Sequence, residues 1–226
     1  MEDKVNARLI PLPNPKHFSN EEMESRSTEF YLNIKQRRTV RDFSSEAVSR
    51  SIIDNCILAA GTAPSGANMQ PWHFAVSGQG EARKIIREKA EKEEKDFYET
   101  KASPQWLKAL EPLGTDANKP FLETAPFLIG IFVKSYGVLP DGSQVKHYYA
   151  TESVGIATGI LITALHNAGL STLTHTPSPM GFLNKIFKRP KNERPFLLLV
   201  AGCAKKGAQV PDIQKMSLGE ISSDIN

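Results

Sequence analysis

Two short runs of almost uninterrupted apolar residues constrain the fold of this chain more than any other feature. They are Phe127–Val133 and Phe196–Ala201. A strand that is apolar on both faces is typical of a sheet covered on both sides. Two further strands are expected at Trp72–Val76 and Ser171–Thr174. Because these strands alternate with helical patterns, the sequence predicts an α/β or α+β fold with three to five strands.

The helical patterns are expected at residues 19–36, 44–61, 80–99 and 146–168. Ser44–Glu46 resembles a helix start, and Gly61 ends the apolar stripe that follows it. The helix at residues 80–99 is highly charged with a thin apolar stripe, which is typical of a helix at the surface or over a cleft. In the last helix, Ser153–Leu165 is apolar on nearly all sides, as expected for a helix at a dimer interface.

Composition indicates one folded domain with appended arms. Hydrophobic residues make up 40% of the 226 residues, and the net charge of +3 is too small to indicate nucleic-acid binding. Proline spacing predicts an extended N-terminal arm at residues 1–18 and irregular structure at residues 100–122. The expected organisation is therefore the 1–18 arm, a main domain at 19–204 with a lid at about 92–122, and a C-terminal arm at 205–226.

The cysteines and the apolar segments bear on the cellular location. Cys56 and Cys203 are far apart in apolar surroundings, so two free thiols in a reducing compartment are favoured over a disulfide. No Cys/His spacing indicates a metal site. Val154–Leu165 is well short of the ~20 residues that span a bilayer. With no signal-peptide pattern in residues 1–16, a cytoplasmic protein is expected.

The segment Arg37–Arg41 concentrates three guanidinium groups around a hydroxyl within five residues. A guanidinium binds phosphate through two parallel hydrogen bonds, which a lysine ammonium cannot do. The segment therefore indicates a phosphate site. Cations at the C-terminal end of an exposed helix are an equally good interpretation of this segment alone.

A second segment, Gly61–Asn68, consists of small residues interrupted by Pro64, and it precedes Gln70-Pro71-Trp72. Small side chains let backbone amides approach a flat ring, so this segment together with the arginines indicates flavin mononucleotide (FMN). On composition alone, a simple loop between a helix and a strand is the better interpretation.

Thr174–Pro177 follows an expected strand, at the sheet edge where α/β proteins place ligand contacts. A threonine hydroxyl there can hydrogen bond to flavin N5 and so favour one-electron transfer. A structural role is the commoner one for a lone threonine at a strand end, and for His175.

These motifs resemble the FMN-dependent nitroreductase superfamily, and the segment from Gly61 to Trp72 is similar to its iodotyrosine deiodinase branch. The similarity covers residues 20–216. It implies an α+β fold with a central mixed sheet flanked by helices, as a domain-swapped homodimer with FMN at the interface. It also implies a set of FMN-binding residues: Arg37, Arg38, Thr39, Val40, Arg41, Pro64, Ser65, Gly66, Thr174, His175, Thr176 and Lys215.

The resemblance further implies substrate contacts at Ala67, Glu94, Tyr98 and Lys119. Glu94 suits the ammonium of a halotyrosine, Lys119 its carboxylate and the amide of Ala67 its phenolate. Tyr98 lies four residues after Glu94, on the same helical face. Thr176 is the expected catalytic residue. Two departures from the animal enzymes are Lys215, where they carry arginine, and the lack of an N-terminal membrane anchor.

The expected reaction is reductive dehalogenation of 3-iodotyrosine and 3,5-diiodotyrosine to tyrosine and iodide, with electrons from NAD(P)H or an external reductase. One alternative is a broad-specificity NAD(P)H-dependent nitroreductase or quinone reductase. Another is a flavin- or halotyrosine-binding protein without turnover. No nicotinamide-binding glycine pattern occurs in the sequence.

Overall fold

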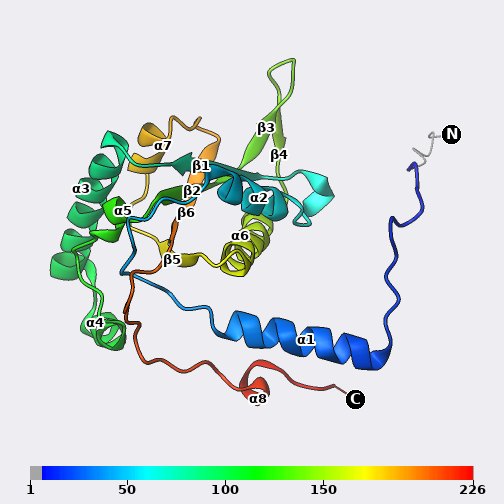
Figure 1. The fold of residues 1–226 in the computed structure, drawn as a ribbon. Coiled ribbons are helices and arrows are strands. Elements are labelled where there is room, and N and C mark those ends of the chain that lie inside the picture. The colour runs from blue at the N-terminus through cyan, green and yellow to red at the C-terminus, as the bar shows by residue number, and fades with distance from the viewer. Residues whose placement is uncertain (1–6, 226) are drawn as a thin grey trace. The chain divides into compact units, whose positions relative to one another are not determined.

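A computed structural model describes residues 7–225, which fall into two units, one ending at Gln36 and one beginning at Arg37. Figure 1 shows the elements of both. Residues 1–6 of the expected N-terminal arm, and Asn226 of the expected C-terminal arm, lie outside the described residues.

The first unit contains one helix. Residues 7–19 form no helix or strand, and α1 (Asn20–Lys35) follows, as predicted. The Ser19 hydroxyl accepts a hydrogen bond from the amide of Glu22 at 3.2 Å and so caps the helix. None of the side chains of α1 is buried. Phe30 and Tyr31 are each 56% exposed.

The second unit is built on a sheet of four strands in the order β1-β2-β6-β5. Neighbouring strands run antiparallel, and a parallel bridge between Thr39 and Thr172 gives the sheet its mixed character. Both runs predicted as buried strands lie in its centre. The strands are β1 (Trp72–Ser77), β2 (Phe127–Lys134), β5 (Ser171–His175) and β6 (Glu193–Gly202).

Helices cover both faces of this sheet (Figure 1). Successive side chains of a strand point to opposite faces, so β2 contributes to two cores. Ile129 and Ile131 pack in the core with α2 and α6, while Leu128 and Phe132 pack in the core with α3, α5 and α7. These helices are α2 (Arg50–Gly61), α3 (Glu81–Asp96), α5 (Phe121–Thr124), α6 (Ala150–Asn167) and α7 (Phe182–Ile186).

The expected start of α2 is wrong. The helix begins at Arg50, because the Ser44 hydroxyl accepts from the amide of Glu46 at 3.0 Å and forms a local turn. The amide of Ser44 also donates to the carbonyl of Cys203 at 2.9 Å, which holds this segment beside the end of β6.

The expected start of α6 is also wrong. The helix begins at Ala150, because β4 (Gln144–Lys146) pairs with β3 (Tyr136–Val138) in a separate two-stranded ribbon. The predicted turn at residues 139–142 connects them. The described residues therefore contain six strands rather than three to five.

The lid has more regular structure than the sequence predicts. Residues 100–122 were expected to be irregular, but α4 (Pro104–Leu110) lies among them, with short helical turns η2 (Phe97–Lys101) and η3 (Glu111–Leu113). Ser103 caps α4 by accepting from the amide of Trp106 at 3.2 Å.

Two short elements lie outside the main layers: η1 (Gly66–Asn68) and α8 (Leu218–Ile221), the latter within the expected C-terminal arm. Among residues 7–225, no helix has both the length and the apolar character needed to cross a membrane.

Candidate active site

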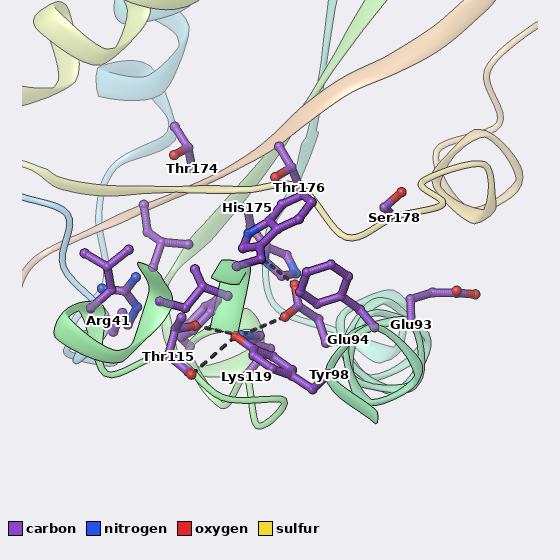
Figure 2. Close-up of a pocket in the computed structure, with 16 residues that line it drawn as sticks. Arg41, Glu93, Glu94, Tyr98, Thr115, Lys119, Thr174, His175, Thr176 and Ser178 are labelled. Atoms are coloured by element: carbon purple, nitrogen blue, oxygen red, sulfur yellow. Dashed lines mark hydrogen bonds and ion pairs between the residues drawn. The ribbon is translucent and has the colours of Figure 1, made fainter. Parts of the chain in front are cut away.

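A cavity of about 460 Å³ lies where the end of β5 meets α3 and the lid. Figure 2 shows Glu94, Tyr98, Thr115 and Lys119 on one side of this cavity, with Thr174 and Thr176 on the other. Predicted site residues from four separate parts of the sequence therefore line one cavity: Arg41, Glu94, Tyr98, Lys119, Thr174, His175 and Thr176.

Glu94 and Lys119 form an ion pair in this cavity, in which Lys119 is buried and Glu94 is largely buried. The Lys119 Nζ lies 3.2 Å from Glu94 Oε2, and their side chains are 4% and 16% exposed, respectively. Lys119 Nζ also donates to the Thr115 hydroxyl at 3.2 Å and to the carbonyl of Asp116. The ammonium thus has one ion-pair partner and two hydrogen-bond acceptors.

The hydroxyl of Tyr98 donates to the carbonyl of Thr115 at 3.3 Å. Glu94 lies in the last turn of α3 and Tyr98 in the π-helical turn η2 that continues it. Tyr98 thereby connects η2 to the lid segment that carries Thr115. A π-helical turn inside a helical region is frequent at functional sites.

Aromatic side chains from the lid form a wall of the cavity. Phe97 contacts Trp106 edge-to-face with ring centroids 5.1 Å apart, and Trp106 is 57% exposed. Leu113 and Phe121 extend the apolar lining. Such a wall suits an aromatic ligand. Phe97, Leu113 and Phe121 are not among the site residues expected from the sequence, although an aromatic residue next to Tyr98 was a usable signal.

His175 is the last residue of β5 and lines the edge of the cavity. Its side chain is 6% exposed, and Phe121 packs edge-to-face on it at 5.9 Å. Burial, with a smaller effect of the Lys119 charge, lowers the pKa of His175 to about 3. Within the described residues its Nε2 atom has no hydrogen-bond partner. His175 is therefore a neutral imidazole at the edge of the cavity.

The burial of neutral His175 predicts a loss of stability in acid. The unfolded chain takes up a proton near pH 6.5 while the folded protein does not, so stability falls as the pH drops from about 6.5 toward 3. Between pH 7 and pH 5 the contribution is about 2 kcal/mol. Urea unfolding of wild type and His175→Gln at both pH values measures it. Between pH 7 and pH 5, His175→Gln is expected to lose less stability than wild type. Equal losses would contradict the assignment of His175 as a buried, neutral imidazole.

Two of the three arginines of the first motif, Arg38 and Arg41, line a smaller cavity of about 280 Å³. Arg37 directly precedes Arg38 in the chain. Arg38, Arg41 and Thr174 line this cavity, and it shares Arg41, Leu113 and Thr174 with the larger one. Arg38 donates to the carbonyl of Pro211, which brings residues 210–212 to the motif. Between residues 7 and 225, no carboxylate lies within 4 Å of Arg37, Arg38 or Arg41.

These cations fit a phosphate ester such as the phosphate of FMN, because they have no anionic partner of their own within the described part of the chain. Thr39 is held at this position by its bridge to Thr172, and Val40 is buried in the core beneath. Thr174 and Thr176 are exposed on one side of the chain at the end of β5 while His175 is buried on the other. Two hydroxyls thus remain available to a ligand beside the arginines.

The 61–70 loop is tightly constrained but does not line these cavities in the single chain. Ala67, Asn68 and Gln70 have positive φ angles of 48°, 52° and 48°, a conformation that non-glycine residues rarely adopt. A Cβ atom on Gly66 would lie 2.8 Å from the carbonyl oxygen of Tyr148. Such strain is often found at functional sites.

The roles expected for Pro64, Ser65, Gly66 and Ala67 therefore stay predictions. The same holds for Lys215, which is exposed and lines neither cavity.

Comparison with known proteins gives a consistent set of relatives. The sequence model of the nitroreductase family matches residues 34–203. The iodotyrosine deiodinase of Haliscomenobacter hydrossis is 54% identical over 94% of this chain and 95% of that protein. That of Nematostella vectensis is 42% identical over 97% of this chain and 83% of that protein.

A solved structure is also similar: an oxidized iodotyrosine deiodinase bound to FMN and 3-iodo-L-tyrosine, with a TM-score of 0.72 at 28% identity. The match covers 83% of this chain and 96% of that chain. The likeness therefore extends over most of this chain and nearly all of that one.

Proposed function

The chain belongs to the iodotyrosine deiodinase branch of the nitroreductase family, and we propose that it catalyses the FMN-dependent reductive dehalogenation of halotyrosines. The substrates are 3-iodotyrosine and 3,5-diiodotyrosine, and the products are tyrosine and iodide. The observation that carries this proposal is the buried Glu94–Lys119 pair beside an aromatic wall. It offers one negative and one positive charge to a ligand that has both.

Substrate recognition follows from exchange of ion pairs. Glu94 accepts the ammonium of the substrate and Lys119 binds its carboxylate, so each protein charge gains a new partner when the two separate. Tyr98 adds a hydrogen bond from the lid. The aromatic wall covers the ring and excludes water from the cavity, which strengthens these polar contacts. A ligand with only one of the two charges leaves one side chain of the pair without a partner.

The residues that would hold FMN are the arginines of the first motif, for its phosphate, and Thr174–Thr176, beside its ring. Bound FMN, once reduced, supplies the two electrons that convert a carbon–halogen bond, with one proton, into a carbon–hydrogen bond and halide. We assign the Thr176 hydroxyl as the group that would hold a hydrogen bond to flavin N5. We assign the amide of Ala67 to the substrate phenolate, an ionised form that an ortho iodine favours.

The functional unit in this proposal is a homodimer in which the 61–70 loop of a second copy completes the site. Pro64–Ala67 do not line the cavities of their own chain. In a dimer, the same residues of the second subunit would contact a ligand bound in these cavities. Helix α6 supports such an interface. Cβ atoms placed on Gly155 and Gly159 would meet no atom within 4 Å, and the neighbouring Ile156 is 47% exposed.

Replacing Gly159 by leucine tests the interface, because the substitution should stabilise a monomer but disrupt a dimer that packs on α6. In a monomer the larger side chain enters open space, and the better helix propensity of leucine raises stability by about 1 kcal/mol. In a dimer packed closely on α6, the same side chain prevents association. We expect Gly159→Leu to elute as a monomer with reduced FMN content. A dimer of unchanged or higher melting temperature would place the interface elsewhere.

The electron donor in this proposal is NAD(P)H or an external reductase, and the protein acts in the cytoplasm. Cys56 and Cys203 are both free thiols, which supports a reducing compartment. Oxidation of NADH and NADPH by the purified protein, with and without substrate, tests whether a separate reductase is needed.

The function itself is tested by titrating oxidised, FMN-loaded protein with 3-iodotyrosine while flavin fluorescence is measured. Saturable quenching, much weaker with tyrosine, and release of iodide after reduction are the expected results. Binding without iodide release would indicate a binding protein. Flavin fluorescence that does not respond, together with nicotinamide-dependent reduction of nitroarenes or quinones, would indicate a general nitroreductase.

A further inference from the structure

Helix α3 carries a row of three charged side chains, Arg83, Arg87 and Glu91, spaced four residues apart on one face. Nearly all their partners lie in one short segment, residues 118–126, which runs from the end of the lid to the residue before β2. This segment includes Lys119. The row ends one turn before Glu94 on the same helix.

Glu91 and Arg87 hold the segment on both sides of Lys119. Glu91 Oε1 accepts from the main-chain amide of Lys119 at 2.7 Å and from Arg87 Nε at 2.7 Å. Arg87 then donates through its two other nitrogens to Asn118 Oδ1 at 3.0 Å and to Glu123 Oε1 at 3.1 Å. The side chains of Arg87 and Glu91 are each 29% exposed, so these bonds are partly shielded from water.

Arg83 fixes the continuation of the segment. Its side chain is 1% exposed and has no carboxylate partner within the described residues. It donates to the carbonyls of Leu122 and Ala125, each at 2.6 Å, and to that of Pro126 at 3.3 Å. The Leu122 carbonyl belongs to α5, and carbonyls in the last turn of a helix have no acceptor role within the helix itself. Arg83 supplies the donor for it. The chain after Lys119 is therefore attached to α3 independently of the outer lid.

We propose that Glu91, supported by Arg87, is a positioning residue that sets the location of Lys119 relative to Glu94, and hence the zwitterion specificity of the site. This inference rests on the proposed function. One rigid helix, α3, fixes the positions of both charges. Glu94 is part of this helix, and Lys119 is held to it through the Glu91 carboxylate. The outer lid, with Trp106 and α4, is then free to move without separating the two groups that recognise the ligand.

The positioning itself is tested in the ligand-free, FMN-loaded protein by hydrogen–deuterium exchange. Glu91→Ala removes the acceptor of the Lys119 amide, so exchange in a peptide that covers Lys119 is expected to accelerate about tenfold. Glu88→Ala is the matched control, because Glu88 is exposed on the same helix one turn earlier. Unchanged exchange at Lys119 in Glu91→Ala would overturn the proposal, whatever the protein binds.

The consequence for specificity is tested by fluorescence titration with two ligands, 3-iodotyrosine and 2-iodophenol. The second ligand has the halogenated ring but neither charge of the amino acid. Glu91→Ala is expected to weaken 3-iodotyrosine about tenfold, the loss of roughly one hydrogen bond, and to leave 2-iodophenol unchanged. An equal loss for both ligands would mean a general structural role and would overturn the proposal.

A double-mutant cycle identifies the group through which Glu91 acts. In a Lys119→Met background, Glu91→Ala should weaken 3-iodotyrosine no further, because the side chain that it positions is absent. A further tenfold loss of 3-iodotyrosine affinity on adding Glu91→Ala to Lys119→Met would overturn the proposal. If Glu91→Ala does not fold, Glu91→Gln, which keeps an acceptor for the Lys119 amide, and Arg87→Gln are compared instead. Wild-type protein that does not bind 3-iodotyrosine contradicts the proposed function, and the exchange experiment still decides the positioning.

Discussion

Replacement of Glu94 by glutamine is expected to weaken 3-iodotyrosine binding about 100-fold while FMN stays bound. Removing one partner of a buried, hydrogen-bonded charge pair typically costs 2–5 kcal/mol, and a factor of 100 is about 2.7 kcal/mol. Glutamine keeps the size of the side chain but has no charge for the substrate ammonium. Flavin fluorescence quenching measures the dissociation constant.

The matched control is Glu99→Gln, which removes a carboxylate that is 61% exposed and 3.8 Å from Lys95. Exposed pairs of this kind contribute little, so binding of 3-iodotyrosine should change by less than about twofold. Binding of 2-iodophenol to the Glu94→Gln protein should also be close to wild type. If Glu94→Gln binds 3-iodotyrosine as tightly as wild type does, the site does not recognise the zwitterion, and a general nitroreductase becomes the better interpretation.

The sequence predicts the interior of the fold better than its edges. Phe127–Val133 is identifiable because a strand covered on both faces has to be apolar at nearly every position. The pair β3 and β4 is not identifiable in the same way. Val138 and all three residues of β4 are exposed, so there is no buried face to produce an alternating pattern.

Helix starts were missed for a related reason. Ser44 has the composition of an N-cap, but its hydroxyl is used in a local turn and its amide bonds to Cys203. Only the tertiary structure distinguishes such a turn from a cap. Ser49, five residues later, precedes the first turn of α2 without a side-chain capping bond.

The candidate site shows the same limit. The spacing of Glu94 and Tyr98 places both on one helical face, but the proximity of Lys119 depends on how the lid returns to α3. Arg83, Arg87 and Glu91 look in the sequence like any charged helix surface. Charge pattern alone cannot distinguish a solvated arginine from Arg83, which is 1% exposed and bound to backbone carbonyls.

The second large effect is expected for the cofactor. Arg41→Ala should lower the affinity for FMN about 100-fold, because a guanidinium bound to phosphate makes two charge-assisted hydrogen bonds, each worth about 1.5–3 kcal/mol. Of the three arginines in the motif, Arg41 is the one that lines both the larger cavity and the smaller one. Titration of the apoprotein with FMN measures the affinity, and the flavin that co-elutes in gel filtration provides an independent check.

Arg41→Lys separates charge from geometry. Lysine keeps the positive charge but offers a single point of contact, so it should recover part of the affinity and make FMN binding more sensitive to salt. Arg50→Ala is the control, since Arg50 is 58% exposed and pairs with Asp54 at 2.8 Å on α2. FMN retained equally by wild type and Arg41→Ala would place the phosphate elsewhere. The interpretation of the Arg37–Arg41 segment as the phosphate site would then be wrong, even if the fold assignment stood.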